Sequence, residues 1–148
     1  MADPLRLDDG MSTLVHFQNN PTLKFYEREV TPPGMDGGAA IDVTNMRNNR
    51  LRTMSPRKLK SLTALSATVM YRSDVFDPDE VWAMINVNQQ ITVEFPDNSF
   101  LQFWGFLQNF QPGPAAEGNV MTATVTVTPS NHNNDSPPLE VDPQYTAP

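Results

Sequence analysis

The feature that most constrains the fold is a strict alternation of apolar and polar residues in the second half of the chain. Residues 89–95 and 120–128 each change character at nearly every step, and threonine fills four of the polar positions in the second segment. Successive side chains of a β-strand point to opposite faces, so a period of two predicts strands with one buried and one polar face. The chain is therefore predicted to be mainly β.

The same reading predicts six strands separated by turn-forming residues. Pro96-Asp97-Asn98-Ser99 has the composition of a hairpin turn, and Gln18-Asn19-Asn20-Pro21 has that of another turn. Residues 100–110 are apolar on both faces, so this strand needs cover on both sides. Gly105 within it predicts a bulge or a close backbone approach. The predicted strands are 13–17, 22–30, 59–72, 89–95, 100–110 and 120–128.

One segment has helical spacing. Asp77 suits an N-cap, Pro78 the first helical position, and Asp79 and Glu80 the first turn. The prediction is a helix of about three turns reaching Asn88, with a core-packing stripe of Val81, Met84 and Ile85.

Two segments lack strand or helix periodicity. The inter-strand loop 31–57 is rich in Pro, Gly and Asn, and it far exceeds the usual connection of about 4–6 residues. Its Met, Ile, Val and Leu residues indicate that it becomes ordered against something. The prolines of residues 131–148 predict an extended C-terminal tail without strands or helices. We therefore expect a β domain over 1–130 with a short tail after it.

The charges are distributed unevenly. Residues 1–72 hold all ten Lys and Arg and seven acids, net +3, whereas residues 73–148 hold ten acids and no Lys or Arg, net −10. Six of the basic residues lie between Arg47 and Lys60. One interpretation is a solvated basic loop; the other is self-complementarity, in which this loop docks on the acidic surface of another copy. The overall charge of −7 argues against binding nucleic acid through phosphate neutralisation.

The sequence offers little catalytic or metal-binding chemistry. Cysteine is absent, and the histidines, His16 and His132, have no serine or carboxylate at a recurrent spacing. Asp77, Asp79 and Glu80 are explained by a helix start. We expect no enzyme, no metal site and no cofactor, and the apolar runs are too interrupted to span a membrane. A glycan-binding β-sandwich, with Phe103, Trp104 and Phe106 as a stacking platform, is an alternative.

Several segments, in their order along the chain, resemble a known family. They are Glu29-Val30-Thr31-Pro32-Pro33-Gly34, Ile41-Asp42-Val43-Thr44-Asn45-Met46, Leu62-Thr63-Ala64-Leu65-Ser66, Ile91-Thr92-Val93-Glu94-Phe95-Pro96-Asp97-Asn98-Ser99, Phe103-Trp104-Gly105-Phe106 and Ala123-Thr124-Val125-Thr126-Val127-Thr128. Together they resemble the major tail tube protein of long, flexible-tailed (siphovirus-type) bacteriophages, over roughly residues 12–131. The family often has glycine where this chain has Asn98, and asparagine tolerates the same backbone conformation.

The resemblance implies a β-sandwich or partial barrel with one short helix and a long inter-strand loop. It implies a structural virion subunit, assembled in the cytoplasm of the host bacterium, whose homohexameric rings stack helically into a hollow conduit for genome ejection. The expected partners are further copies of the chain, a tape measure protein, and tail terminator and distal tail proteins. Double-stranded DNA would pass through without specific binding. The alternative within this architecture is a related ring protein, of the type VI secretion kind or a tail-completion protein.

Two sets of residues are candidates for these roles. The loop would contact an adjacent ring through Asp42, Arg47, Arg50, Arg52, Arg57, Lys58 and Lys60. A lumen suits acidic and neutral polar side chains, because phosphates slide past a wall that does not pair with them. The lumen candidates are Gln90, Thr92, Glu94, Thr122, Thr124, Thr126 and Thr128; the alternative for them is an ordinary solvated sheet face.

Overall fold

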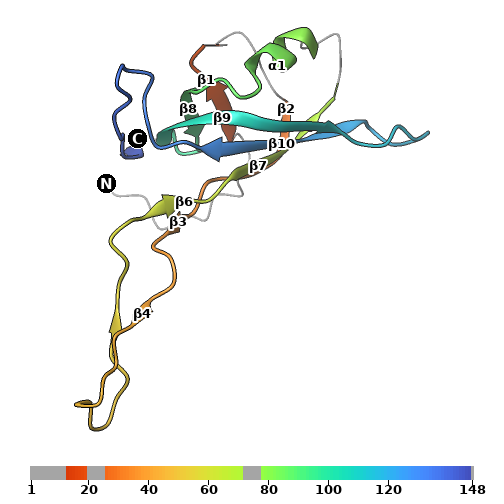
Figure 1. Cartoon of the computed structure of the whole chain (residues 1–148). Coiled ribbons are helices and arrows are strands. Elements are labelled where there is room, and N and C mark those ends of the chain that lie inside the picture. Colours follow the sequence, from red (N-terminus) through yellow and green to blue (C-terminus); the bar gives the residue numbers. More distant parts are fainter. Residues whose placement is uncertain (1–12, 20–25, 72–77, 148) are drawn as a thin grey trace, which may run out of the picture.

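The computed structural model describes residues 13–19, 26–71 and 78–147 and shows a β body from which a long hairpin projects (Figure 1). The body is a seven-stranded antiparallel sheet in the order β1-β8-β9-β10-β7-β2, with β11 paired to β9. Its strands are β1 (Leu14–Phe17), β2 (Tyr26–Thr31), β7 (Leu65–Met70), β8 (Gln89–Glu94), β9 (Phe100–Pro112), β10 (Thr122–Pro129) and β11 (Gln144–Thr146). The mainly β prediction is confirmed.

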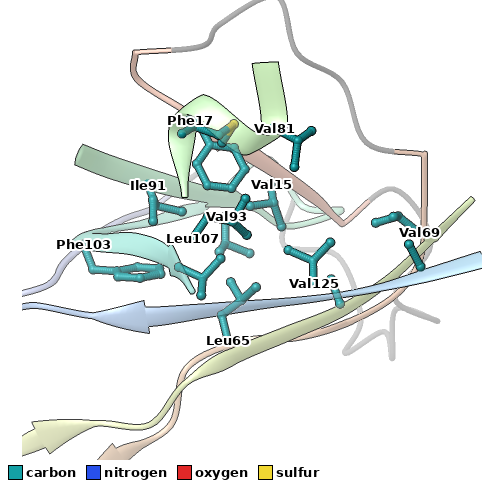
Figure 2. Close-up of a cluster of buried hydrophobic side chains, with 14 of the residues drawn as sticks. Val15, Phe17, Leu65, Val69, Val81, Ile91, Val93, Phe103, Leu107 and Val125 are labelled. Carbon is teal, nitrogen blue, oxygen red and sulfur yellow. The ribbon is translucent and has the colours of Figure 1, made fainter. Parts of the chain in front are cut away.

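The sheet curls until its two edge strands approach each other. The backbone N–H of Val15 in β1 donates to Oε1 of Glu27 in β2 over 3.1 Å. Curling gives the sheet a concave face, which encloses the core, and a convex face, which turns away from it. Figure 2 shows the core between the two sides of the curl. Its buried members are Val15, Phe17, Leu65, Ala67, Val69, Val81, Met84, Ile91, Val93, Leu101, Phe103, Leu107, Ala123, Val125 and Val127.

The predicted alternation is present in the central strands. In β8 every second residue is buried, beginning with Gln89, and in β10 Ala123, Val125 and Val127 are buried between threonines. The first strand, predicted at 13–17, is confirmed as β1. The second, predicted at 22–30, is described from Tyr26 to Thr31 as β2, and its predicted start falls in residues 20–25, which lie outside the description.

The helix α1 (Pro78–Met84) covers the concave side, and its Val81 and Met84 join the core. The predicted core stripe is confirmed, but the helix has about two turns and not three. It ends because Asn86 takes a left-handed conformation with φ of 64°, a common helix C-terminus. The backbone N–H of Asn86 then donates to the carbonyl of Leu107 in β9. The predicted N-cap, Asp77, lies outside the described residues.

Strand β9 contains a bulge that reverses the orientation of its second half. Val127 of β10 pairs with Leu107 of β9, whereas Thr126, which precedes Val127, pairs with Asn109. Gln108 is therefore the extra residue in β9. Phe110 therefore pairs with Val125 and packs against the core, where its ring lies 6.0 Å from that of Tyr71. Uninterrupted alternation along residues 100–110 predicts that Phe110 shares a face with Trp104, and the bulge makes that prediction wrong.

The close approach predicted at Gly105 is confirmed. A Cβ placed there would lie 2.7 Å from the carbonyl oxygen of Thr128, closer than atoms approach without a backbone shift. The neighbouring strand therefore requires glycine at this position.

The long inter-strand loop predicted at 31–57 is present, but it contains short paired strands that its composition did not predict. The chain from Met35 to Leu62, which we call the arm, is a long hairpin built from β3 (Met35–Asp36), β4 (Ile41–Asp42), β5 (Met54–Ser55) and β6 (Ser61–Leu62). β3 pairs with β6 near the body, and β4 pairs with β5 further out. The predicted strand 59–72 is divided accordingly, because Leu59 belongs to the arm and is 79% exposed.

The prediction of a C-terminal tail without strands is also wrong, because β11 (Gln144–Thr146) pairs with residues 100–102 of β9. This short segment lies between Pro143 and Pro148, so none of its own residues lacks a backbone donor. The start of the tail is held by Asn88, whose Nδ2 donates to the carbonyl of His132 and to Oδ1 of Asn134, both at 2.9 Å.

Candidate functional site

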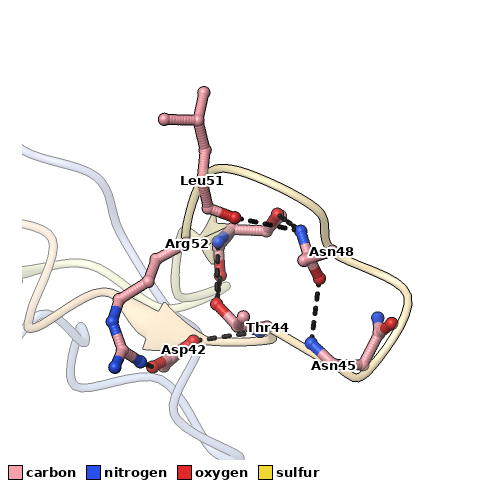
Figure 3. Close-up of polar contacts among 7 residues, drawn as sticks. Asp42, Thr44, Asn45, Asn48, Leu51 and Arg52 are labelled. Atoms are coloured by element: carbon pink, nitrogen blue, oxygen red, sulfur yellow. Dashed lines mark hydrogen bonds and ion pairs between the residues drawn. The ribbon is translucent and has the colours of Figure 1, made fainter.

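The tip of the arm is an ordered turn organised by Asn48 (Figure 3). Its Oδ1 accepts from the backbone N–H of Asn45 at 2.9 Å, and its Nδ2 donates to Oγ1 of Thr53 at 2.7 Å. Oγ1 of Thr44 accepts from the N–H of Thr53 at 2.8 Å, across the two sides of the hairpin. Asparagine and threonine side chains thus replace the ladder hydrogen bonds that the turn itself lacks.

Three of the sequence-predicted arm residues stabilise the arm itself. Nη1 of Arg52 lies 3.3 Å from Oδ2 of Asp42, and Nε of Arg57 donates to the carbonyl of Ala39 at 2.7 Å. Hydrogen bonds from Thr44, and then from Arg52, hold the pKa of the Asp42 carboxyl below its usual value. Asp42, Arg52 and Arg57 therefore connect the two sides of the hairpin.

The other four predicted arm residues remain available for contacts outside the chain. Arg47, Arg50, Lys58 and Lys60 are exposed and form no ion pair with any described residue. The arm holds six Lys and Arg and two Asp, a net charge of +4.

The arm also exposes large apolar side chains. Met46, at its tip, is fully exposed, and the whole set is Met35, Ile41, Val43, Met46, Leu51, Met54 and Leu59. Figure 1 shows why, since most of the arm extends away from the body. Seven large apolar side chains exposed on one projecting hairpin are more than the scattered single ones that a monomer surface normally shows, and they favour a binding role.

The predicted lumen residues lie on the convex face of the sheet. Gln90, Thr92 and Glu94 occupy the convex positions of β8, and the four threonines Thr122, Thr124, Thr126 and Thr128 occupy those of β10. The two rows are separated by β9, whose Gln102 pairs with Thr92 and whose Phe106 pairs with Thr128. The structure thus places both rows on one face without direct pairing between them.

Two ionisable residues on this face, Glu29 and His16, were not predicted from the sequence. Glu29 pairs with Thr68 on the convex side, because a register shift between Glu27 and Glu29 sends these two carboxylates to opposite faces. Nε2 of His16 lies 3.2 Å from Oε2 of Glu94. Neither position was recognisable without the bulge or the strand order. At the paired positions of the described register the convex face holds no Lys or Arg, but Arg28, the exposed bulge residue of β2, lies at its edge.

The convex face is not polar throughout. Phe100, Trp104 and Phe106 of β9 lie on it and are half-buried. The strand predicted to be apolar on both faces is therefore confirmed in its first half, and these rings cover the middle of the face.

Over the described ranges, His, Asp and Glu side chains form no group of three that would suit a metal ion. No helix in that same part of the chain has the length and apolar character needed to cross a membrane.

No family model matches the chain, and no curated protein matches it. Solved structures do. A chain in the virion of the native gene transfer agent (GTA) particle superposes with a TM-score of 0.66 at 13% identity, covering 95% of this chain and 100% of that one. A chain in the tail of the empty GTA particle, which has C6 symmetry, gives 0.65 at 12% identity over the same shares.

A chain in the six-fold symmetrised baseplate of the anti-feeding prophage (AFP) gives a TM-score of 0.63 at 10% identity, covering 99% of this chain and 98% of that one. At these identities the likeness establishes the fold. The fold of this chain is thus one found in phage-derived tail particles, over nearly the full length of each partner.

Proposed function

We propose that this chain is a structural subunit of a phage-type tail, and that six copies form a ring which stacks on further rings into a hollow tube. The fold it shares with chains of the GTA virion, the GTA tail and the AFP baseplate supports this role. The tail of the empty GTA particle has C6 symmetry, which supports a six-fold ring here.

The arm is the single observation that carries the proposal. It is a two-stranded hairpin, a structure that is marginally stable alone in water, and it exposes seven large apolar residues. Ordering such a segment costs conformational entropy, and its exposed apolar side chains gain no burial against the body to offset that cost. A second copy that covers these side chains offsets that cost, so the arm is best explained as an assembly contact.

Charge complementarity favours another copy of this chain as the partner. The arm carries +4, whereas residues 78–147 contain eight acids and no Lys or Arg. Opposite charges on two parts of one chain favour head-to-tail contact between copies and disfavour contacts between like parts. Such a contact repeats without closing on a dimer, as a stack of rings requires.

The convex face is the proposed lumen wall. At its paired positions this face holds threonines, glutamines and carboxylates, with Glu29 and Glu94 among them, and no Lys or Arg. Arg28, the bulge residue of β2, lies at its edge, so DNA phosphates would meet few cations with which to pair. DNA would then pass during ejection without specific binding. By the same proposal the chain is a virion protein assembled in the host cytoplasm, and it meets a tape measure protein and the proteins at either end of the tail.

Shortening the arm tests the proposal. Asp36 and Ser61 are paired across β3 and β6, so a two-residue Asn-Gly turn can replace residues 37–60 without altering the body. We expect this variant to fold with an unchanged thermal midpoint but to form no tubes by negative-stain electron microscopy. Normal tubes from the shortened chain would overturn the role assigned to the arm.

A second candidate is a ring protein at the end of a tail, which the likeness to a chain of the AFP baseplate favours. Such a protein forms discrete six-fold rings and not long tubes. Electron microscopy of the purified full-length chain separates the two candidates by the length of the assembled particles.

A further inference from the structure

We propose that Trp82 on α1 is the docking point for the arm tip of a second copy of this chain. This inference rests on the proposed function and identifies the surface that the arm contacts. Trp82 is 79% exposed, whereas its helix neighbours Val81 and Met84 are each 3% exposed and pack in the core. The helix is therefore held to the body without Trp82, and the indole remains on the surface.

The chemistry around Trp82 suits a cationic partner. An indole face is the best aromatic partner for a guanidinium group, and the pairing strengthens when water is displaced from it. Residues 78–147, which include α1 and the chain that follows it, contain no Lys or Arg. Asp79 and Glu80 in the first turn add negative charge to the same element.

The arm tip carries the matching groups. Arg47 and Arg50 are exposed and form no ion pair within the described part of the chain, and Met46 and Leu51 beside them are 102% and 73% exposed. The hydrogen bonds of Asn48 fix the turn that presents these side chains. A preorganised tip loses little conformational entropy when it docks.

The direction of the arm makes this a contact between copies. Figure 1 shows α1 on one side of the sheet and the arm leaving on the other, so the arm tip of one chain lies far from its own Trp82. A contact that joins opposite sides of identical subunits is heterologous, and it extends from copy to copy. It therefore continues along a stack, as the proposed tube requires.

Crosslinking tests the contact directly, because the natural chain has no cysteine. One protein carries Leu51→Cys at the arm tip, and a second carries Ala83→Cys, an exposed position beside Trp82. The two are mixed, assembled and treated with a short bis-maleimide. We expect a crosslinked dimer on a denaturing gel. The matched control replaces Ala83→Cys by Val120→Cys, which is 56% exposed on the β9–β10 hairpin, and should give no dimer.

Substitution of the indole supplies an independent readout. Trp82→Ala should leave the thermal midpoint of the unassembled chain unchanged and raise the concentration needed for assembly about tenfold or more, with Trp82→Phe between it and the natural chain. In a Trp104→Phe background, Trp82 is the remaining tryptophan, and its fluorescence should shift to shorter wavelength on assembly.

The outcomes separate this inference from the function on which it rests. If tubes form but the Leu51→Cys and Ala83→Cys proteins do not crosslink, the docking point is wrong. It is also wrong if the Trp82→Ala variant assembles at the same concentration as the natural chain. Both results leave the proposed tube subunit standing. A full-length chain that forms no assembly overturns both.

Discussion

Asn86, Asn98 and Asn131 occupy left-handed backbone conformations, with φ of 64°, 68° and 62°. Asparagine is among the few residues that adopt this region at low cost. Asn98 lies in the turn between β8 and β9, where its N–H donates to the carbonyl of Phe95 and the N–H of Phe95 donates to the carbonyl of Ser99. The tight return of this hairpin therefore depends on the conformation of a single residue.

Asn98→Ala should lower the free energy of unfolding by about 1 kcal/mol, because a Cβ-bearing residue without a polar side chain is strained at positive φ. The thermal midpoint would fall by about 3 °C for a chain of this size. Asn98→Gly is the matched control and should be neutral. An alanine variant as stable as the glycine variant would contradict the assignment of strain to this position.

Glu27 gives the body a pH dependence of known sign. Burial raises the pKa of its carboxyl, against the smaller lowering by backbone N–H donors that include Val15. The folded state then binds the proton more tightly than the unfolded state, so stability falls as the pH rises from the ordinary carboxyl pKa through the raised value. The carboxylate is thus a net cost at neutral pH.

Glu27→Gln keeps an oxygen acceptor for the N–H of Val15 and removes the charge. We expect a higher thermal midpoint at pH 7 than in the natural chain and a flatter dependence of stability on pH between about 4 and 7. Thermal melts across this range check the slope. If the slope stays as steep as in the natural chain, another group accounts for it.

At the scale of elements, periodicity was a good guide where a strand is regular. β8 and β10 follow the alternation read from the sequence, and Gly105 marks the close approach predicted for it. The sequence did not reveal the bulge at Gln108, since one extra residue depends on pairing with β10 and leaves no local signal. It changes the face of Phe110 and so changes which aromatic rings lie outside the core.

The hairpin structure of the arm was not predicted, because its strands are two residues long and its tip is held by side chains. Pairs such as Ile41 with Ser55 lie far from any alternating run, and the Asn and Thr residues that suggested a loop are the ones that bond across the hairpin. The predicted arm residues all lie on this one element, but Asp42, Arg52 and Arg57 have contacts within it that composition could not reveal.

Asn48→Ala should loosen the arm tip without affecting the body, because the contact of the arm with the core is made by Leu62 at its base and not by residues of the tip. We expect faster amide hydrogen exchange over residues 43–53, an unchanged thermal midpoint of the body, and an assembly concentration raised about tenfold. Asn48→Asp keeps the acceptor for the N–H of Asn45 and should have a smaller effect on exchange there. A fall in the thermal midpoint of the body would show that the tip supports the core.

For the whole molecule, the separation of charge matters more than any single ion pair. Among the described residues, the ion pair of Arg52 with Asp42 and the contact of His16 with Glu94 both have exposed members, and such contacts contribute little to folding. In the proposed assembly, the basic arm of one copy meets the acidic body of the next. Assembly should therefore weaken as salt is added, although the apolar contacts of the arm would remain.

Glu94→Lys tests the lumen assignment at this scale. If the convex face lines the conduit, a ring of six lysines would bind passing phosphates, so tubes should form while DNA ejection slows severalfold. Glu94→Gln removes the charge without adding a cation and should eject at the natural rate. Both variants alter the contact with His16, so a defect shared by the two would reflect that contact and not the lumen.

The central claim is that this chain is complete only when joined to further copies of itself. Electron microscopy of the purified full-length protein, combined with sedimentation over a range of concentrations, tests it most directly. The account predicts hollow particles with six-fold symmetry, built from stacked rings. A chain that sediments as a monomer at millimolar concentration in mild salt would contradict it.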